Sequence, residues 1–210
     1  MSRAWCGRVK TQVVSIVDYS LAGAPFQSTT WFPNPVGGVD IRYWSAEGVR
    51  GDSSRAWYAD NVSNTSHRST SYAVRLVRGS GSVGSRYSFS TVAYGTDGAN
   101  NLVRDAWTGL QWRRCEQGRV WSGSECTGTP STFTHEQALT HAKAQTGWRL
   151  PNVKELSSLS ELGVGTGALI DGVAFPGASD ASYMWTSSPL LYFSGSAWML
   201  GVGNGTVGRD

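Results

Sequence analysis

The chain has 210 residues, a formal charge of +3 at pH 7 and a sequence pI near 8.9. This length is enough for one large domain or two small ones, and ten Trp, eight Tyr and six Phe can supply a core. The basic residues are scattered instead of clustered, so the composition argues against a nucleic-acid partner.

The composition also predicts which kinds of secondary structure dominate. With 26 Gly and many Ser and Thr, the chain favours short strands and turns over long helices. Arginine outnumbers lysine fifteen to three. This bias suits bidentate binding of carboxylate or sulfate groups, but it is also consistent with GC-rich coding, so both interpretations stay open.

Residues 1–79 are predicted to form an incomplete first unit. Apolar side chains recur at helical spacing over residues 9–21, and a loop is expected over residues 22–35. The polar stretch 61–71 is predicted to be an exposed hairpin loop. Strands are expected at three places from their residue types and their alternation: residues 41–45, 56–61 and 72–78.

Residues 80–88 are the predicted linker, because they are mostly Gly and Ser. The overlapping run 79–84 matches the Gly-x-Gly-x-x-Gly pattern of dinucleotide-binding loops. No helix is expected after it, since residues 89–94 have the pattern of a strand, so no helix N-terminus would receive a phosphate. We attribute the match to the glycine-rich composition.

Residues 89–210 are predicted to form a second, more complete unit. A turn and strand are expected over residues 108–115, and further strands over residues 183–186 and 196–202. Thr134 can cap a helix that ends near Gly147, with Gln137 as its capping-box partner. No strand like residues 72–78 follows, so the second unit is expected to lack its closing strand.

Residues 148–156 change from an extended to a helical pattern in one step. The first three, an arginine between an aromatic and an aliphatic residue, have the pattern of a half-buried strand. Pro151 favours an extended conformation for the residue before it, and Asn152 can cap the run that follows. We therefore expect a strand–turn–helix corner with the helix beginning near Val153.

The two units share landmarks. Three aromatic pairs recur roughly 140 residues apart, a period too long for a solenoid: Phe32 with Phe175, Trp44 with Trp185, and Trp57 with Trp198. We interpret the chain as two related units, the first without its beginning and the second without its end.

Three cysteines leave at least one unpaired. Cys115 and Cys126 flank a polar, glycine-containing loop whose ends a hairpin would bring together, which favours a disulfide. The alternative is two reduced thiols in a cytoplasmic protein. Cys6 lies in the first unit and has no evident partner.

No apolar leader follows Met1, and the apolar run at residues 13–17 is far too short to cross a bilayer. As written, the chain would remain where it is made. That expectation conflicts with a disulfide unless the chain is a gene fragment or lacks its leader.

No catalytic or metal-binding arrangement emerges from the pattern. The three histidines, His67, His135 and His141, lack metal-ligand spacing and are expected to be exposed. Four oxygen-bearing residues could hold calcium: Asp97, Asn100, Asn101 and Asp105. They lack EF-hand spacing, and turn formation is the favoured interpretation. We expect no metal ion and no cofactor.

Ligand-binding residues are expected in loops, where recognition sites usually lie. The candidates of the first unit are Arg55, Asn61, Asn64, His67 and Arg68. Those of the second unit are Tyr192, Phe193 and Asn204. Three further residues could stack on sugars, but their place among the landmarks favours core packing: Trp148, Trp185 and Trp198.

The landmarks of the second unit resemble one known family over residues 103–204. Its distinctive element is Trp-Arg-Leu-Pro-Asn at residues 148–152. Other landmarks follow in the same order as in the Lcl C-terminal-domain family: Thr-Gly-Leu-Gln-Trp at residues 108–112, the Cys115 and Cys126 pair, Phe175-Pro176, and Trp185-Thr186-Ser187-Ser188. The resemblance implies an α+β, C-type-lectin-like fold with short antiparallel strands, two helices and long loops.

The resemblance also implies a bacterial protein displayed outside the cell, in a family whose members include adhesin domains for sulfated polysaccharide. We therefore expect a non-catalytic binding or adhesion module whose partner is a polysaccharide or a cell-surface protein, with oligomers allowed. Residues 72–78 would complete the sheet of the second unit. Two alternatives stay open: an enzyme of the formylglycine-generating type, which needs reactive cysteines, and a non-functional gene fragment.

Overall fold

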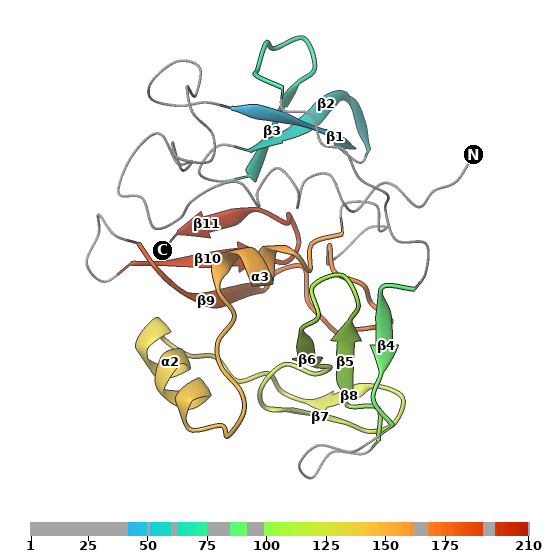
Figure 1. The fold of residues 1–210 in the computed structure, drawn as a ribbon, viewed down its shortest axis with the longest axis vertical. Helices are drawn as coiled ribbons and strands as arrows, with labels where there is room; N and C mark the ends of the chain where they lie inside the picture. The colour runs from blue at the N-terminus through green and yellow to red at the C-terminus, as the bar shows by residue number, and fades with distance from the viewer. Residues whose placement is uncertain are drawn as a thin grey trace.

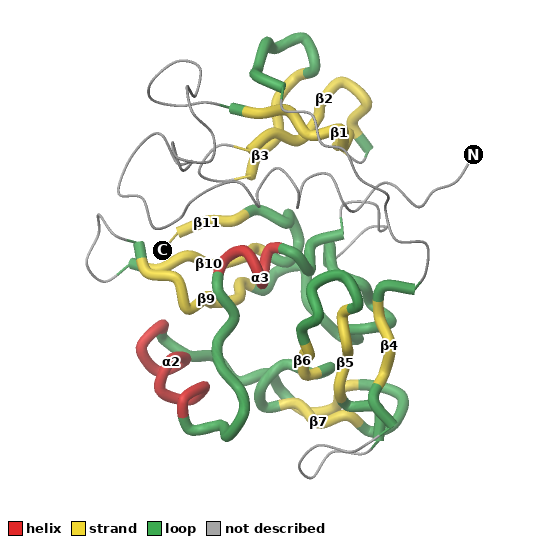
Figure 2. The backbone as a smooth tube through the Cα atoms, in the orientation of Figure 1, coloured by secondary structure: helices red, strands yellow, loops and turns green. Residues whose placement is uncertain are grey.

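The computed structural model describes residues 42–49, 51–59, 63–74, 85–91, 99–161, 168–190 and 196–209. Within them the chain forms short strands, mostly in antiparallel sheets, and two short helices, which confirms an α+β fold (Figures 1 and 2). The helix expected over residues 9–21, the loop over residues 22–35 and Cys6 lie outside the described residues.

The first sheet is a meander of β1 (Tyr43–Val49), β2 (Asp52–Ala59) and β3 (Ser63–His67). Gly51 takes the turn between β1 and β2 at φ +75°, a conformation that glycine adopts readily. The prediction of a loop over residues 61–71 is wrong for β3. Its side chains are polar, but its backbone groups still need partners and find them along β2.

The segment after β3 returns to the first sheet. Ala73 forms a parallel bridge with Tyr43, in which the Trp44 N–H donates to the Ala73 carbonyl at 3.0 Å. The Ala73 N–H donates to the Arg42 carbonyl at 2.9 Å. The hypothesis that residues 72–78 complete the second unit is therefore wrong for residues 72–74, and residues 75–78 lie outside the described residues.

The second sheet contains β4 (Tyr87–Phe89), β5 (Leu102–Asp105) and β6 (Gln111–Arg113). The end of the predicted linker belongs to this folded part, because Arg86 is buried and the Tyr87 ring lies in the main core. The average composition of residues 80–88 did not indicate that the two large side chains near their end, Arg86 and Tyr87, are buried. The turn before β6 has Gly109 at φ +74°, as expected for residues 108–115.

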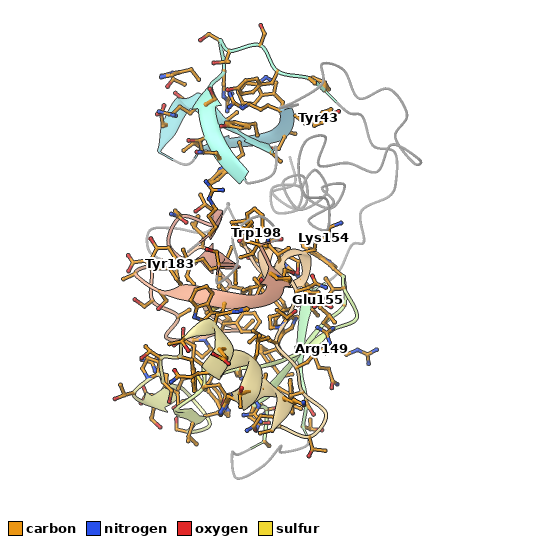
Figure 3. The ribbon with its side chains drawn as sticks, turned by 90° about the vertical axis from the view of Figure 1, so that its left-hand side faces the viewer. Tyr43, Arg149, Lys154, Glu155, Tyr183 and Trp198 are labelled. Carbon is orange, nitrogen blue, oxygen red and sulfur yellow. A yellow bond between two sulfur atoms is a disulfide. The ribbon has the colours of Figure 1, made fainter. Side chains whose placement is uncertain are left out.

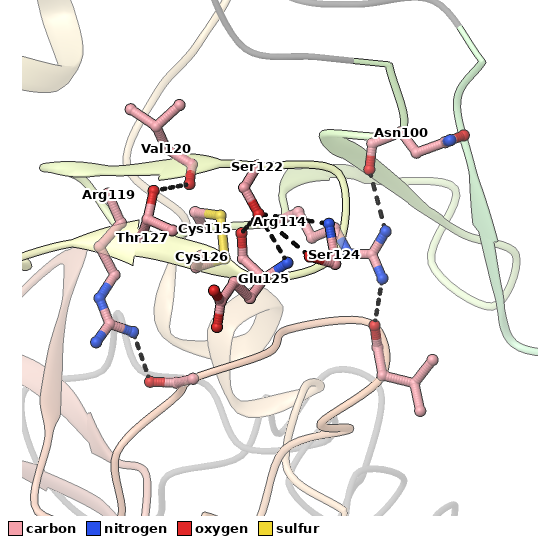
Figure 4. The surroundings of a disulfide bond; sticks show 12 residues. Asn100, Arg114, Cys115, Arg119, Val120, Ser122, Ser124, Glu125, Cys126 and Thr127 are labelled. Atoms are coloured by element: carbon pink, nitrogen blue, oxygen red, sulfur yellow. Dashed lines mark hydrogen bonds between the residues drawn. A yellow bond between two sulfur atoms is a disulfide. The ribbon is translucent and has the colours of Figure 1, made fainter.

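β7 (Arg119–Trp121) and β8 (Cys126–Gly128) form a hairpin next to the disulfide. Cys115 and Cys126 are bonded, with their Cα atoms 5.6 Å apart, so the predicted pair is confirmed. Figure 4 shows the bond tying β8 to the segment that leaves β6.

Both predicted helix starts are confirmed. α2 (His135–Lys143) begins after Thr134, whose side chain forms a capping box with Gln137. α3 (Val153–Ser157) begins after Asn152. The first helix ends at Lys143, earlier than the expected Gly147.

The expected strand at residues 148–150 is wrong. Trp148 and Leu150 are partly buried and Arg149 is exposed, so the predicted alternation of side chains is present. No strand of the described chain pairs with these residues, however, and they form a segment without regular secondary structure that leads into Pro151. An alternating pattern indicates which side chains are buried, but it does not show whether the backbone has a neighbouring strand to pair with.

The third sheet is a meander of β9 (Tyr183–Pro189), β10 (Ala197–Gly201) and β11 (Val207–Arg209). The strands expected at residues 183–186 and 196–202 are confirmed. β11 follows where no strand was expected, and it pairs antiparallel with β10. The glycine-rich sequence around it has low strand propensity, which is why the pattern did not reveal it.

The main core lies between the third sheet, α3 and the strands β4 and β5 (Figure 1). Trp198 is buried in it, as expected, whereas Trp148 and Trp185 are only partly buried. The buried members are Tyr87, Val103, Val153, Leu156, Leu159, Ile170, Ala174, Phe175, Trp198, Leu200, Val202 and Val207.

The first and third sheets share strand order and register. Two residue pairs of β1 and β2 recur in β9 and β10, all displaced by the same number of positions along the chain: Trp44–Tyr58 as Trp185–Met199, and Tyr43–Ala59 as Met184–Leu200. In Figure 1 the first sheet lies at the top, the third sheet in the middle, and β4–β8 with α2 below.

Candidate functional site

The first sheet has two faces of different character, because successive side chains of a strand point to opposite sides. Tyr43, Trp57 and Ala59 share one face and are buried. Trp44 and Tyr58 lie on the other. We call this second side the aromatic face and define it by six residues: Arg42, Trp44, Tyr58, Asn64, Arg68 and Tyr72.

Three rings form the centre of the aromatic face. The Tyr72 ring centroid lies 4.7 Å from that of Trp44 and 4.8 Å from that of Tyr58, and Trp44 meets Tyr58 edge-on at 6.3 Å. The Tyr72 hydroxyl donates to Ser66 Oγ at 3.3 Å. Tyr58 is buried, whereas Trp44 and Tyr72 remain partly exposed. The rings hold one another in place and leave apolar surface open to a ligand.

Arg68 reaches across β2 toward β1. Its Nε donates to the Arg55 carbonyl at 3.1 Å, and its Nη2 lies so close to Gly48 that a side chain there would collide with it. Gly48 pairs with Ala56, whose side chain points to the same side as Tyr58. The exposed guanidinium of Arg68 therefore lies at the rim of the aromatic face.

Two further polar groups border the rings. The Arg42 Cζ atom lies 5.5 Å from the Tyr58 centroid and 5.7 Å from the Tyr72 centroid, within the range of a cation–π contact. Asn64 stands opposite Tyr58 in the register, and its Oδ1 accepts from the Thr65 N–H at 2.7 Å. Arg42 and Asn64 are both exposed, so the aromatic face offers two cations and an amide around its rings.

The other predicted residues of the first unit lie elsewhere. Arg55 and His67 face each other across β2 and β3 on the side of Trp57, away from the aromatic face. Arg55 Nη2 donates to the Thr65 carbonyl at 3.3 Å. Sequence reasoning placed these residues in one group, but the register divides them, and Asn61 lies outside the described residues.

Asp52 adds a negative charge near Arg55 and His67. Hydrogen bonds from the Ser54 hydroxyl and the Ser54 N–H hold the pKa of Asp52 below its usual value, and the charges of Arg55 and His67 lower it further. The negative charge of Asp52 therefore partly offsets the positive charge of Arg55.

Of the predicted ligand-binding residues of the second unit, the structure describes Asn204. Asn204 stabilises the turn between β10 and β11: its Oδ1 accepts from the Thr206 N–H at 3.0 Å and from the Thr206 hydroxyl at 2.7 Å. Its amide oxygen therefore has a structural role. Tyr192 and Phe193 lie outside the described residues.

Arg114 fastens the disulfide hairpin to distant loops. Its Cζ lies 3.8 Å from the Trp121 centroid and 4.2 Å from the Phe89 centroid. Its two terminal nitrogens donate to the carbonyls of Asn100 and Val173, at 3.3 and 2.8 Å, and burial lowers the pKa of Arg114 (Figure 4).

Arg119 acts in the same way from β7, with Nη1 donating to the Gly177 carbonyl at 2.8 Å (Figure 4). Arginine suits this use because its fork of donors binds several carbonyls in fixed directions. In the second unit, Arg114 and Arg119 thus hold loops in place.

Asp105 is not available as a calcium ligand. It is completely buried, and Arg86 donates Nε and Nη2 to its two carboxylate oxygens. Burial raises the pKa of Asp105, but hydrogen bonds from Arg86 and from the Trp107 N–H outweigh this effect, and the net pKa lies below the usual value.

The other calcium candidates are no better placed. Asn101 is buried, Asn100 takes the left-handed conformation of a turn at φ +66°, and Asp97 lies outside the described residues. Among the residues that the structure describes, no group of three or more His, Cys, Asp or Glu side chains could hold a metal ion.

Two of the three histidines are partly buried, which corrects the expectation of exposure. His135 Nε2 lies 2.9 Å from the Thr186 carbonyl oxygen, and His141 Nε2 lies 3.1 Å from Gln117 Oε1. They attach α2 to neighbouring elements. His67 is exposed, as predicted.

A family model described as the Lcl C-terminal domain matches residues 101–210, just over half of the chain. The match covers β5 to β11, both helices and the disulfide, and begins after the aromatic face. No curated protein and no solved structure is significantly similar to the chain. In the described part of the chain, no helix has the length and apolar character needed to span a membrane.

Proposed function

Because the chain belongs to the Lcl C-terminal domain family, we propose that it is a non-catalytic binding module that attaches to sulfated polysaccharide through the aromatic face. The observation that carries this proposal is the pair of exposed arginines, Arg42 and Arg68, beside the partly exposed rings of Trp44 and Tyr72. Guanidinium groups bind sulfate through paired hydrogen bonds, and sugar rings pack on aromatic faces. A sulfated sugar chain offers both groups at once.

The state of the cysteines supports a non-catalytic role. Cys115 and Cys126 are bonded to each other, so neither provides the thiolate that a reactive-cysteine enzyme requires. The disulfide also supports a location outside the cytosol, since such bonds persist in oxidising compartments. We include in the proposal an extracellular or cell-surface location and a C-type-lectin-like architecture.

We also propose that the first sheet is the closing part of a second Lcl-type unit. The support is the shared register: Trp44 and Trp57 occupy the positions in β1 and β2 that Trp185 and Trp198 occupy in β9 and β10. Two unrelated three-stranded meanders would not be expected to share both the tryptophan positions and the partner positions of Trp44 and Trp185. In this proposal the chain contains two related units, and the aromatic face belongs to the first of them.

Binding to immobilised heparin tests the proposal, with chemically desulfated heparin as the matched control. The folded chain is expected to bind heparin, to bind the desulfated form much more weakly, and to lose heparin binding as NaCl rises from 0.05 to about 0.5 M, because salt screens exposed charges. Equal binding to both sugars would remove sulfate recognition. No binding by a sample that melts cooperatively would remove the polysaccharide proposal.

A further inference from the structure

The third sheet has an open edge along the first half of β9. The Val202 N–H donates to the Ser182 carbonyl at 2.9 Å, so the backbone groups of Ser182 face β10. Backbone groups of successive residues in a strand point to alternate sides. Tyr183 and Trp185 therefore turn their N–H and C=O groups away from β10, toward the outer edge.

Pro151 closes only the far end of this edge. The Ser187 N–H, which also points outward, donates to the Pro151 carbonyl at 2.8 Å. A parallel neighbour at that place would return a hydrogen bond to the Trp185 carbonyl, but proline has no N–H to give. Within the described chain, no backbone group pairs with the Tyr183 carbonyl or with the outward groups of Trp185.

In the first sheet, the equivalent edge along β1 has a backbone partner. Its equivalent groups are the Arg42 carbonyl and the Trp44 N–H, because β1 and β9 have the same register with their neighbours. Both are occupied by one residue, Ala73, which accepts from Trp44 at 3.0 Å and donates to Arg42 at 2.9 Å. A single residue in parallel orientation thus occupies this edge of the first sheet through two backbone hydrogen bonds.

We propose that the β9 edge between Tyr183 and Trp185 binds an extended protein segment, which adds as a parallel strand in the way that Ala73 adds to β1. Strand addition to an exposed edge is a general mode of peptide recognition, in which main-chain hydrogen bonds supply much of the affinity. The bridging residue of the segment must not be proline, since its N–H has to reach the Tyr183 carbonyl.

The side chain of Tyr183 gives the segment an apolar contact. It is 65% exposed, an unusual state for a large aromatic residue, and Figure 3 shows it on the outer side of the third sheet. This protein-binding edge lies on a different sheet from the aromatic face, so it goes beyond polysaccharide binding and does not depend on it.

Amide hydrogen exchange on the full chain tests the proposal. The probe is a blocked peptide with the sequence of residues 70–77, Thr-Ser-Tyr-Ala-Val-Arg-Leu-Val, and the matched control has proline in place of its alanine. Without peptide, the Trp185 amide is expected to exchange quickly and the Trp44 amide slowly. Saturating peptide is expected to slow exchange at Trp185 by about tenfold or more, and the proline peptide is expected to have no effect.

Three results would overturn the proposal. One is a Trp185 amide that millimolar peptide leaves unchanged. The second is a loss of protection at Trp44 with no gain at Trp185, which would mean that the peptide only displaces the chain's own segment. The third is protection of Trp185 that appears without peptide as the chain is concentrated, which would identify a second copy of the chain as the occupant.

Discussion

Arg86 and Asp105 form a buried ion pair that uses both carboxylate oxygens. Arg86 Nε lies 3.0 Å from Oδ1 and Nη2 lies 2.7 Å from Oδ2, with the two side chains 6% and 0% exposed. Arg86 Nη2 also donates to the Ser158 carbonyl at 2.8 Å. The pair therefore joins β5 to the end of α3.

Replacing one partner of this pair leaves the other charge buried and uncompensated. Arg86→Met is expected to lower the free energy of unfolding by about 3–5 kcal/mol, measured by urea denaturation. The double variant with Asp105→Leu is expected to cost much less than the sum of the two single changes. A cost for Arg86→Met below about 1 kcal/mol would contradict a role for the pair in holding β5 against α3.

Glu161 gives the same region a pH dependence. Burial raises the pKa of Glu161, the charges of Asp171 and Asp105 add to the rise, and Arg86, 3.7 Å away, opposes it. A raised pKa means that the folded state holds this proton more tightly than the unfolded state. The contribution of Glu161 to stability is therefore present below about pH 4.3 and is lost as the pH rises through the folded pKa.

Glu161→Gln removes that titration. The variant is expected to melt at a higher temperature than the parent chain at pH 7.5 and at nearly the same temperature at pH 4. Thermal unfolding followed by circular dichroism at both pH values measures the difference. A lower melting temperature at pH 7.5 would show that the ion pair with Arg86 outweighs the cost of burial.

Two variants at the start of α3 compare the stability contribution of a helix cap with that of a surface ion pair. Asn152 Oδ1 accepts from the Glu155 N–H at 2.9 Å, and Asn152→Ala is expected to cost about 1 kcal/mol. Arg149 binds the same Glu155 with two contacts of 2.7 Å, but it is 62% exposed (Figure 3). Arg149→Ala is expected to cost about 0.5 kcal/mol or less. Urea denaturation of the two variants would contradict this account if their order were reversed.

The disulfide constrains a short loop, with Cys115 and Cys126 separated by 11 positions. For a loop of this length, loop-closure entropy predicts a stabilisation of about 3 kcal/mol. The Cys115→Ser, Cys126→Ser double variant is expected to lose about that amount. Dithiothreitol should lower the melting temperature of the parent chain and leave that of the variant unchanged. A reductant effect on the variant would point to another source of sensitivity.

Local signals in the sequence predicted three features of residues 89–210: two helix starts and one disulfide. Thr134 and Asn152 were recognised as caps because a short polar side chain before an apolar helical run has a direct physical role. The Cys115 and Cys126 pair followed from the short loop between them. These features depend on neighbours along the chain, which a single sequence displays.

Register and tertiary pairing could not be predicted in the same way. The candidate site residues Asn64 and His67 are three positions apart, but whether they share a face depends on β3 being a strand, and its polar sequence concealed this. The sequence contains Trp44 and Tyr58 within expected strands, but it does not show that Tyr72 contacts them. That contact depends on the parallel bridge between Ala73 and Tyr43. Arg86 was assigned to the Gly- and Ser-rich linker, and no neighbouring residue indicated its partner Asp105, nineteen positions away.

The central claim is that the aromatic face binds a sulfated sugar chain, and a titration of a heparin octasaccharide against three forms of the protein tests it most directly. The forms are the parent chain, the Arg42→Gln, Arg68→Gln double variant, and Arg104→Gln, which removes an exposed arginine of β5 on another sheet. Loss of charged hydrogen bonds predicts that the double variant binds at least about tenfold more weakly, with Arg104→Gln unchanged. Equal affinity of all three forms, or equal weakening of both variants, would contradict the claim.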